Sequence, residues 1–204
     1  MSSSAAGPLE KSVVRGTDAQ NLIEKIVRLR IYESVYWKQH CFGLTSAALV
    51  EKAAALDYYG GVKSYTNSPT PFLCLLLKLL QLLPELGIVK LLISNQEFKY
   101  MRLLGAYYLR LTGTPVQIYS ILEPLYSDYR KVRKLTVSGW ELFHVDEVIH
   151  ELLTGEISLN MALPKLADRD TLVEVGMLLP YKSLLDGEMD AASSESETSS
   201  SEDQ

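Results

Sequence analysis

The spacing of apolar residues predicts helices in the first half of the chain. Apolar residues recur on helical spacing from Leu22 to Ile31, after a capping box at Thr17–Gln20. We expect this helix to continue into an aromatic cluster and to stop before Gly43. The same spacing predicts a second helix that begins at Thr45.

Two Thr-Pro pairs predict further helix starts. Thr70-Pro71 and Thr114-Pro115 each place a capping hydroxyl before a proline at the first helical position. The helix after Thr70 is nearly all leucine with one narrow polar stripe, so we expect it to be central and buried on most sides. Helices are also expected at 85–93 and 96–111, and Pro124 should interrupt the helix that starts at Pro115.

The pattern changes near residue 134. Two runs of strand-forming residues, 134–137 and 140–143, flank Ser138-Gly139 and predict a small β-hairpin. Helical spacing returns at 145–153 and again around 171–179. The expected fold class is therefore all-α, a mainly helical single domain with one small β-hairpin near 134–143.

The two ends of the chain lack any apolar period. Residues 1–16 are small and polar, and residues 186–204 are rich in serine and acidic residues. We therefore expect both ends to be disordered and residues 17–185 to form the helical domain. Ser194, Ser199 and Ser200 each have an acid three residues on, so they are candidate phosphorylation sites.

The net charge of −5 belongs to the acidic end segment. That segment holds seven of the 25 acidic residues and no base, which leaves 18 acids against 20 bases in residues 1–185. A body near +2 carries no net charge signal for strong nucleic-acid binding.

No catalytic, cofactor or metal site is predicted. The spacing Glu-x-x-His occurs at Glu141–His144 and at Glu147–His150. Di-iron sites need such motifs on facing helices, and these two are neighbours in the sequence. No glycine-rich phosphate loop occurs, and the two cysteines are expected to be buried and reduced. The most apolar stretch, Phe72–Leu83, is interrupted by Lys78 and Gln81 and is too short to span a membrane. We therefore expect a protein that is not an enzyme.

Tyrosine is the unusual residue, with twelve tyrosines against four phenylalanines. Several tyrosines stand beside bases, and tyrosine and arginine are favoured anchors at protein interfaces. The same mixture could bind single-stranded RNA, and tyrosine is also common at the boundary of a core. We predict that protein contacts involve Arg30, Tyr107, Tyr108, Arg110, Tyr126, Tyr129 and Arg130. The alternative is direct RNA binding by the Tyr/basic stretch 126–134.

Five stretches, taken in order, are specific enough to compare with known families. They are RLRIYESVYWKQHCFGL (28–44), TPFLCLLLKLLQLLP (70–84), FKYMRLLGAYYLRLTGT (98–114), LEPLYSDYR (122–130) and HVDE (144–147). Together they resemble the pre-mRNA-splicing factor 38 family over about residues 17–185. Animal members of that family carry long Arg/Ser-rich tails, and the acidic segment at 186–204 does not resemble them.

The resemblance implies an all-helical, non-catalytic scaffold that acts in the nucleus. Family members belong to the spliceosome before activation, in or arriving with the tri-snRNP, and are needed for the rearrangement that makes it catalytic. The resemblance also implies two protein partners. One is a small zinc-finger splicing protein, and the other is an extended helical splicing factor related to microfibrillar-associated protein. We expect any RNA contact to be indirect.

Overall fold

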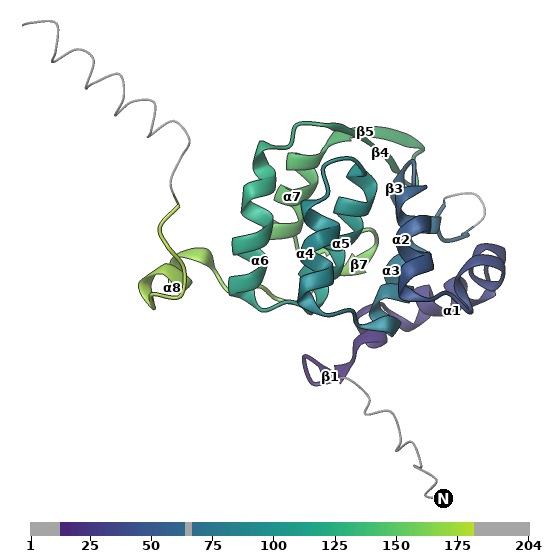
Figure 1. Ribbon diagram of the computed structural model, residues 1–204, viewed down its shortest axis with the longest axis horizontal. Helices are drawn as coiled ribbons and strands as arrows, with labels where there is room; N and C mark the ends of the chain where they lie inside the picture. The colour runs from purple at the N-terminus through teal and green to yellow at the C-terminus, as the bar shows by residue number, and fades with distance from the viewer. Residues whose placement is uncertain (1–12, 64–66, 182–204) are drawn as a thin grey trace, which may run out of the picture. The chain divides into compact units, whose positions relative to one another are not determined.

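A computed structural model describes residues 13–63 and 67–181 of the chain (Figure 1). The chain divides into two units, Met1–Leu166 and Ala167–Gln204, which are described separately. Among the described residues, the first unit holds helices α1 to α7 and all the strands, and the second holds helix α8.

The N-terminal segment differs from the single helix predicted to start at Thr17. The chain instead forms two short strands (β1, Val13–Val14, and β2, Thr17–Asp18), a 3-10 turn (η1, Ala19–Leu22), the helix α1 (Lys25–Glu33) and a π-helical turn (η2, Trp37–Cys41). Asp18 caps the first turn by accepting a hydrogen bond of 3.1 Å from the N–H of Gln20. Helix α1 ends at Ser34, whose hydroxyl donates a hydrogen bond of 2.7 Å to the carbonyl of Ile31.

The next helices begin largely where the sequence predicts. They are α2 (Ser46–Ala54), α3 (Pro71–Leu82), α4 (Leu86–Ser94), α5 (Lys99–Thr112) and α6 (Pro115–Leu122). Thr45, Thr70 and Thr114 each accept a hydrogen bond from the third amide of the helix that follows. Pro124 lies in a 3-10 turn, η3 (Glu123–Ser127), which ends α6 as predicted. The starts after Thr45, Thr70 and Thr114 are confirmed because a cap acts locally, whereas α5 begins at Lys99 and not at the predicted residue 96.

Helices α3 and α5 form the centre of the core. Every residue from Phe72 to Leu80 is buried, as the leucine pattern of α3 predicts. Every residue from Tyr100 to Leu111 is also buried, although this part of α5 contains tyrosines and arginines. The reason is position, because α5 contacts α2, α3, α4, α6 and α7.

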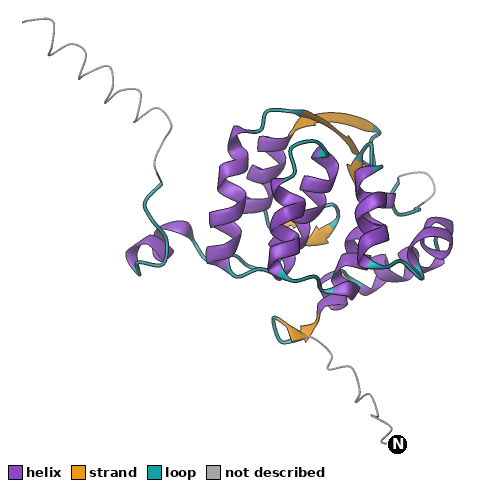
Figure 2. Ribbon diagram, in the orientation of Figure 1, coloured by secondary structure: helices purple, strands orange, loops and turns teal. Residues whose placement is uncertain are grey.

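A small sheet joins distant parts of the first unit (Figure 2). Strand β3 (Tyr59–Gly60) pairs in parallel with β4 (Lys131–Leu135), which pairs antiparallel with β5 (Trp140–His144). The β4–β5 hairpin confirms that a hairpin forms here, but its two-residue loop is Val137–Ser138 and not the predicted Ser138-Gly139, because Thr136 and Gly139 pair with each other. Helix α7 (Val145–Thr154) ends at Gly155, and β6 (Ile157–Ser158) pairs with β7 (Met161–Ala162). The first unit is therefore mainly helical with small sheets, and the all-α expectation is too strict.

The second unit is described only in its first part. Helix α8 (Arg169–Glu174) lies there, shorter than the helix expected around 171–179. The predicted phosphorylation sites Ser194, Ser199 and Ser200 lie outside the described residues and stay predictions. Of the helices that the structure describes, none has the length and apolar character that a membrane crossing requires.

Candidate protein-binding surface

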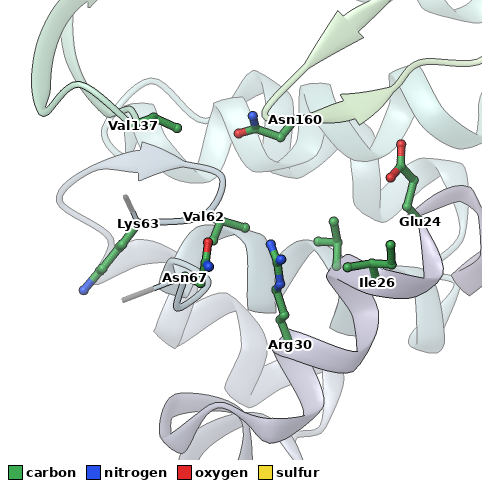
Figure 3. A pocket seen from close by; sticks show the side chains of 9 residues that line it. Glu24, Ile26, Arg30, Val62, Lys63, Asn67, Val137 and Asn160 are labelled. Carbon is green, nitrogen blue, oxygen red and sulfur yellow. The ribbon is translucent and has the colours of Figure 1, made fainter. Parts of the chain in front are cut away.

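A cavity of about 250 Å³ lies beside α1 and contains Arg30, one of the seven predicted contact residues. Its lining residues are Glu24, Ile26, Val27, Arg30, Val62, Lys63, Asn67, Val137 and Asn160. Figure 3 shows the Arg30 side chain rising from α1 into the cavity, between Ile26 and Val62. Four segments that are far apart in the sequence therefore meet around one cation.

Tight turns bring the walls of this cavity together. Asn67 and Asn160 have φ angles of 49° and 60°, in the left-handed region that asparagine tolerates better than most residues. Gly61 packs directly on the second of these turns, since a Cβ atom at Gly61 would lie 2.7 Å from the carbonyl oxygen of Leu159. A larger residue at position 61 would push the two walls apart.

The cavity offers free positive charge next to apolar surface. Within the described residues, neither the Arg30 guanidinium nor the Lys63 ammonium contacts a carboxylate, and Glu24 is the one acid among the lining residues. The side chains of Ile26 and Val137 are largely exposed at its rim. This arrangement suits a protein segment that carries a carboxylate beside an aliphatic side chain.

Three of the seven predicted contact residues lie in the core and not on the surface. Tyr107, Tyr108 and Arg110 are on α5 and are 0%, 4% and 2% exposed. A partner of the folded protein cannot reach them, which corrects the prediction from sequence. The sequence pattern was misleading because neighbouring tyrosines and arginines suit a protein interface and also suit a core in which their polar ends are hydrogen-bonded.

The polar ends of these three residues are used inside the fold. The Tyr107 hydroxyl lies 2.8 Å from the Ser158 hydroxyl, and burial raises the pKa of Tyr107. Burial also raises the pKa of Tyr108. The Arg110 guanidinium donates to the carbonyls of Leu152 and Pro164, both at 2.7 Å, and burial lowers its pKa. These residues stabilise the fold around α5 instead of binding a partner.

Tyr126, Tyr129 and Arg130 lie near Asp128 in the sequence, just before the hairpin, and Arg130 contacts its carboxylate. The Arg130 guanidinium donates to both carboxylate oxygens of Asp128, at 2.7 and 2.6 Å, and Arg102 donates to the same carboxylate at 2.5 Å. Burial of Asp128 opposes its ionisation, but the hydrogen bonds from Arg130 and Arg102 outweigh it and lower its pKa. Tyr129 is 67% exposed, and the Tyr126 hydroxyl lies 3.3 Å from Nδ1 of His150. This cluster and the Arg30 cavity are built from different elements.

The basic run that suggested RNA binding is largely neutralised within the fold. Arg130 pairs with Asp128, while Arg133 lies 3.1 Å from Asp57 and Lys134 lies 3.0 Å from Glu151. An RNA site needs several free cations along the phosphate backbone. The folded run offers fewer of them than the sequence suggests.

Neither Glu-x-x-His pair is arranged around a metal position in the described chain. The Glu147 carboxylate accepts a hydrogen bond of 2.7 Å from the N–H of His144 and caps α7, and this bond lowers the pKa of Glu147. Over residues 13–63 and 67–181, no group of three or more His, Cys, Asp or Glu side chains could hold a metal ion.

Sequence reasoning missed two exposed apolar residues on the hairpin. Trp140 and Leu142 are each 59% exposed, and the Arg133 guanidinium lies 5.6 Å from the centre of the Trp140 ring. Both residues fall in the predicted second strand, at alternate positions. Alternation of this kind places them on one face, which was the signal available in the sequence.

Comparison with known proteins gives matches over most of the chain. The family model described as the PRP38 family matches residues 12–176. The chain is 54% identical over 184 residues to "Pre-mRNA-splicing factor 38" of Arabidopsis thaliana, which covers 90% of this chain and 52% of that protein. It is 51% identical over 178 residues to "Pre-mRNA-splicing factor 38A" of Homo sapiens, covering 87% of this chain and 57% of that protein. The chain thus spans little more than half the length of these relatives.

A solved structure with a similar fold comes from a protein complex. It is the crystal structure of the Snu23-Prp38-MFAP1(217-258) complex of Chaetomium thermophilum. A chain of that complex matches with a TM-score of 0.81 and 38% sequence identity, covering 91% of this chain and 100% of that chain.

Proposed function

Because the chain belongs to the PRP38 family, we propose that it is a non-catalytic spliceosomal scaffold required for pre-mRNA splicing. It acts in the nucleus with the tri-snRNP, in the maturation and activation of the spliceosome, by binding other splicing proteins. The observation that carries this proposal is the structural match to the full length of a chain crystallised in the Snu23-Prp38-MFAP1 complex. The partners are accordingly the counterparts of Snu23 and MFAP1.

The Arg30 cavity is the docking point that we assign to one of these partners. The Arg30 guanidinium extends into a cavity that exposed Ile26 and Val137 also line, so a partner segment gains a charge-assisted hydrogen bond and apolar contact together. Arginine is one of the three residue types that carry much of the energy at protein interfaces. Tyr129, exposed beside Arg130, is a second contact in this proposal.

A non-catalytic role agrees with the use of the ionisable residues. Asp128 pairs with two arginines, and Glu147 caps a helix. Burial raises the pKa of Cys41 to about 11 and that of Cys74 to about 12, so neither thiol is an activated nucleophile at neutral pH. These groups support the fold and are not poised for acid-base or nucleophilic chemistry.

A binding experiment with purified counterparts of Snu23 and MFAP1 tests the docking point. We expect Arg30→Glu in the full chain to raise the Kd of one partner by about tenfold or more, because it reverses the central charge. Lys38→Glu makes the same charge change at an exposed residue outside the cavity, so it should bind like the wild type. Equal binding by wild type and Arg30→Glu would remove the cavity from the proposal and leave the scaffold role standing.

A complementation experiment tests the function itself. Nuclear extract depleted of the endogenous protein should assemble spliceosomes that fail to activate, and the full chain should restore both activation and splicing. Failure of the wild-type chain to bind either partner, together with failure to restore splicing, would overturn the proposed function.

A further inference from the structure

The outer edge of β5 is an open sheet edge that the proposed function leaves unused. The sheet order is β3-β4-β5, so β4 covers one side of β5, and no strand of the described chain pairs with the other side. Figure 1 shows β5 as the outer strand of the hairpin. We propose that this edge binds an extended segment of another protein by β-strand addition, with Trp140 and Leu142 as its side-chain contacts. The surface uses none of the residues that line the Arg30 cavity, and it does not rest on the identity of the partners proposed above.

The hydrogen-bond pattern of the hairpin fixes which backbone groups face outward. Thr136 and Gly139 exchange both backbone hydrogen bonds, at 2.8 and 3.3 Å. Hydrogen-bonded and non-hydrogen-bonded pairs alternate along an antiparallel ladder, so the pairs of Trp140 with Leu135 and of Leu142 with Arg133 are non-hydrogen-bonded. The backbone N–H and C=O groups of Trp140 and Leu142 therefore point away from β4, toward the open edge.

Three further contacts agree with this assignment. Arg133 directs its N–H away from β5, to the Tyr100 hydroxyl at 3.1 Å. His144 directs its N–H away from β4, to the Glu147 carboxylate. The N–H of Val145 returns to the carbonyl of Arg130 at 3.1 Å, as the next hydrogen-bonded pair requires. No hydrogen bond within the described residues occupies the outward groups of Trp140 and Leu142.

The side chains along this edge are those of an interface. Trp140 and Leu142 project on the same face of β5 and stay largely exposed. Beside them a groove of about 440 Å³ runs between the hairpin and the ends of α2 and α5, and Leu56, Phe98 and Leu142 supply apolar surface to it. Natural proteins usually blunt an open edge with charged residues, whereas β5 has its exposed Glu141 on one face and an exposed tryptophan and leucine on the other.

The charge around the groove selects the occupant. Lys99, Lys131 and Arg133 line it against Asp57 and Glu97, and Asp57 is already paired with Arg133. Lys99 donates to the carbonyl of Lys131 at 2.6 Å and contacts no carboxylate in the described chain. The occupant is therefore an extended protein segment with apolar side chains at alternate positions and carboxylates among them. A polypeptide is favoured over RNA because only a peptide backbone supplies donors and acceptors at strand spacing.

The test uses a defined peptide and the full chain. Short random peptides are displayed on phage and selected on the chain, and the best binder is resynthesised as the probe. We expect selected sequences to alternate apolar and acidic residues. We also expect the probe to slow hydrogen exchange of the Trp140 and Leu142 amides, which are the donors at the edge.

Three variants separate the backbone contact from the side-chain contact. Leu142→Pro removes one outward N–H while leaving the hydrogen bonds to β4, and should raise the Kd of the probe by about tenfold. Leu142→Val keeps that N–H and should bind within about threefold of wild type. Trp140→Ala should also raise the Kd by about tenfold, and it tests the proposal even if Leu142→Pro does not fold.

The possible results either support or overturn the proposal. Slowed exchange at Trp140 and Leu142 together with loss of affinity in the variants supports it. Failure to select any peptide, or a probe that binds Leu142→Pro and Trp140→Ala as it binds wild type, overturns it. Tight binding of oligouridine that is lost in Lys131→Glu and falls steeply with salt, without peptide binding, would overturn it in favour of RNA. Dimerisation of the chain that Leu142→Pro abolishes, without peptide binding, would overturn it in favour of a second copy.

Discussion

Replacing Asp128 by alanine should destabilise the first unit by about 3 kcal/mol, whereas replacing Asp57 should cost less than about 1 kcal/mol. Each aspartate pairs with an arginine through a contact short enough for a hydrogen bond, 2.5 Å to Arg102 and 3.1 Å to Arg133. The pairs differ in burial. Both side chains of the Asp128 pair are 8% exposed, whereas those of Arg133 and Asp57 are 54% and 71% exposed.

The difference in magnitude follows from what each substitution leaves behind. Without Asp128, the buried Arg102 keeps its charge and only the carbonyls of Asn95 and Ser94 as partners. A buried cation that loses its counterion pays its full desolvation cost. Without Asp57, the Arg133 guanidinium remains in water, which replaces the lost carboxylate at little cost.

Urea unfolding of the two variants and wild type measures the contrast. We expect Asp128→Ala to lower the midpoint while the slope stays the same, since the unfolded surface does not change. In thermal unfolding the loss corresponds to a melting temperature about 6–12 °C lower. Equal losses of stability in Asp128→Ala and Asp57→Ala would refute the reasoning from burial.

The pairing of Asp128 with its arginines also predicts how the stability of the protein depends on pH. The pKa of Asp128 is lower in the folded protein, because the hydrogen bonds from its arginines outweigh the effect of burial. The stability gained by its ionisation is therefore complete above about pH 4, the ordinary pKa of an aspartate, and is lost as the pH falls through the lower folded-state value. Asp128→Asn removes this titration, so the gap in stability between Asp128→Asn and wild type should narrow on acidification. A gap that stays constant would contradict the assignment.

Three further predictions concern the core. Tyr107→Phe should cost about 1 kcal/mol in urea unfolding, through the lost hydroxyl hydrogen bond; unchanged stability with weaker partner binding would instead place this residue at an interface. Gly105→Ala should destabilise by about 1–3 kcal/mol in the same assay, although alanine is the better helix former, because its Cβ would lie 2.8 Å from a side-chain carbon of α4. Cys41 and Cys74 are buried and their pKa values are raised to about 11 and about 12, so both should react with a thiol reagent only as fast as the chain opens. Reaction of either thiol in the native protein at the rate of a free thiol would contradict that burial.

The hairpin and the helix starts illustrate what local chemistry can predict. Thr70, Thr114 and the turn at 136–139 act on residues within a few positions of themselves, so their effect can be read from the sequence. The prediction of one helix from Thr17 was wrong because the side chains of Asp18 and Ser34 form hydrogen bonds with the backbone that compete with those of a continuous helix. Such competition is decided by the surrounding structure.

The candidate sites were less predictable than the fold. Arg30 was identified from composition, but its cavity is made by Val62, Val137 and Asn160, which come from three other segments. The exposed edge of β5 also depends on which strands pair with which. Neither property is contained in the pattern of any one segment.

The sequence by itself determined the helix-rich class, the burial of α3 and the family, because these depend on local capping, apolar spacing and strings of residues. Only the tertiary structure decided that α5 is central, since five helices pack around it and bury its tyrosines and arginines. The same tyrosines and arginines would be accessible to a partner if fewer helices covered them. Burial is a property of the packed assembly, and it assigned Tyr107 and Arg110 to stability while leaving Arg30 and Trp140 open to binding.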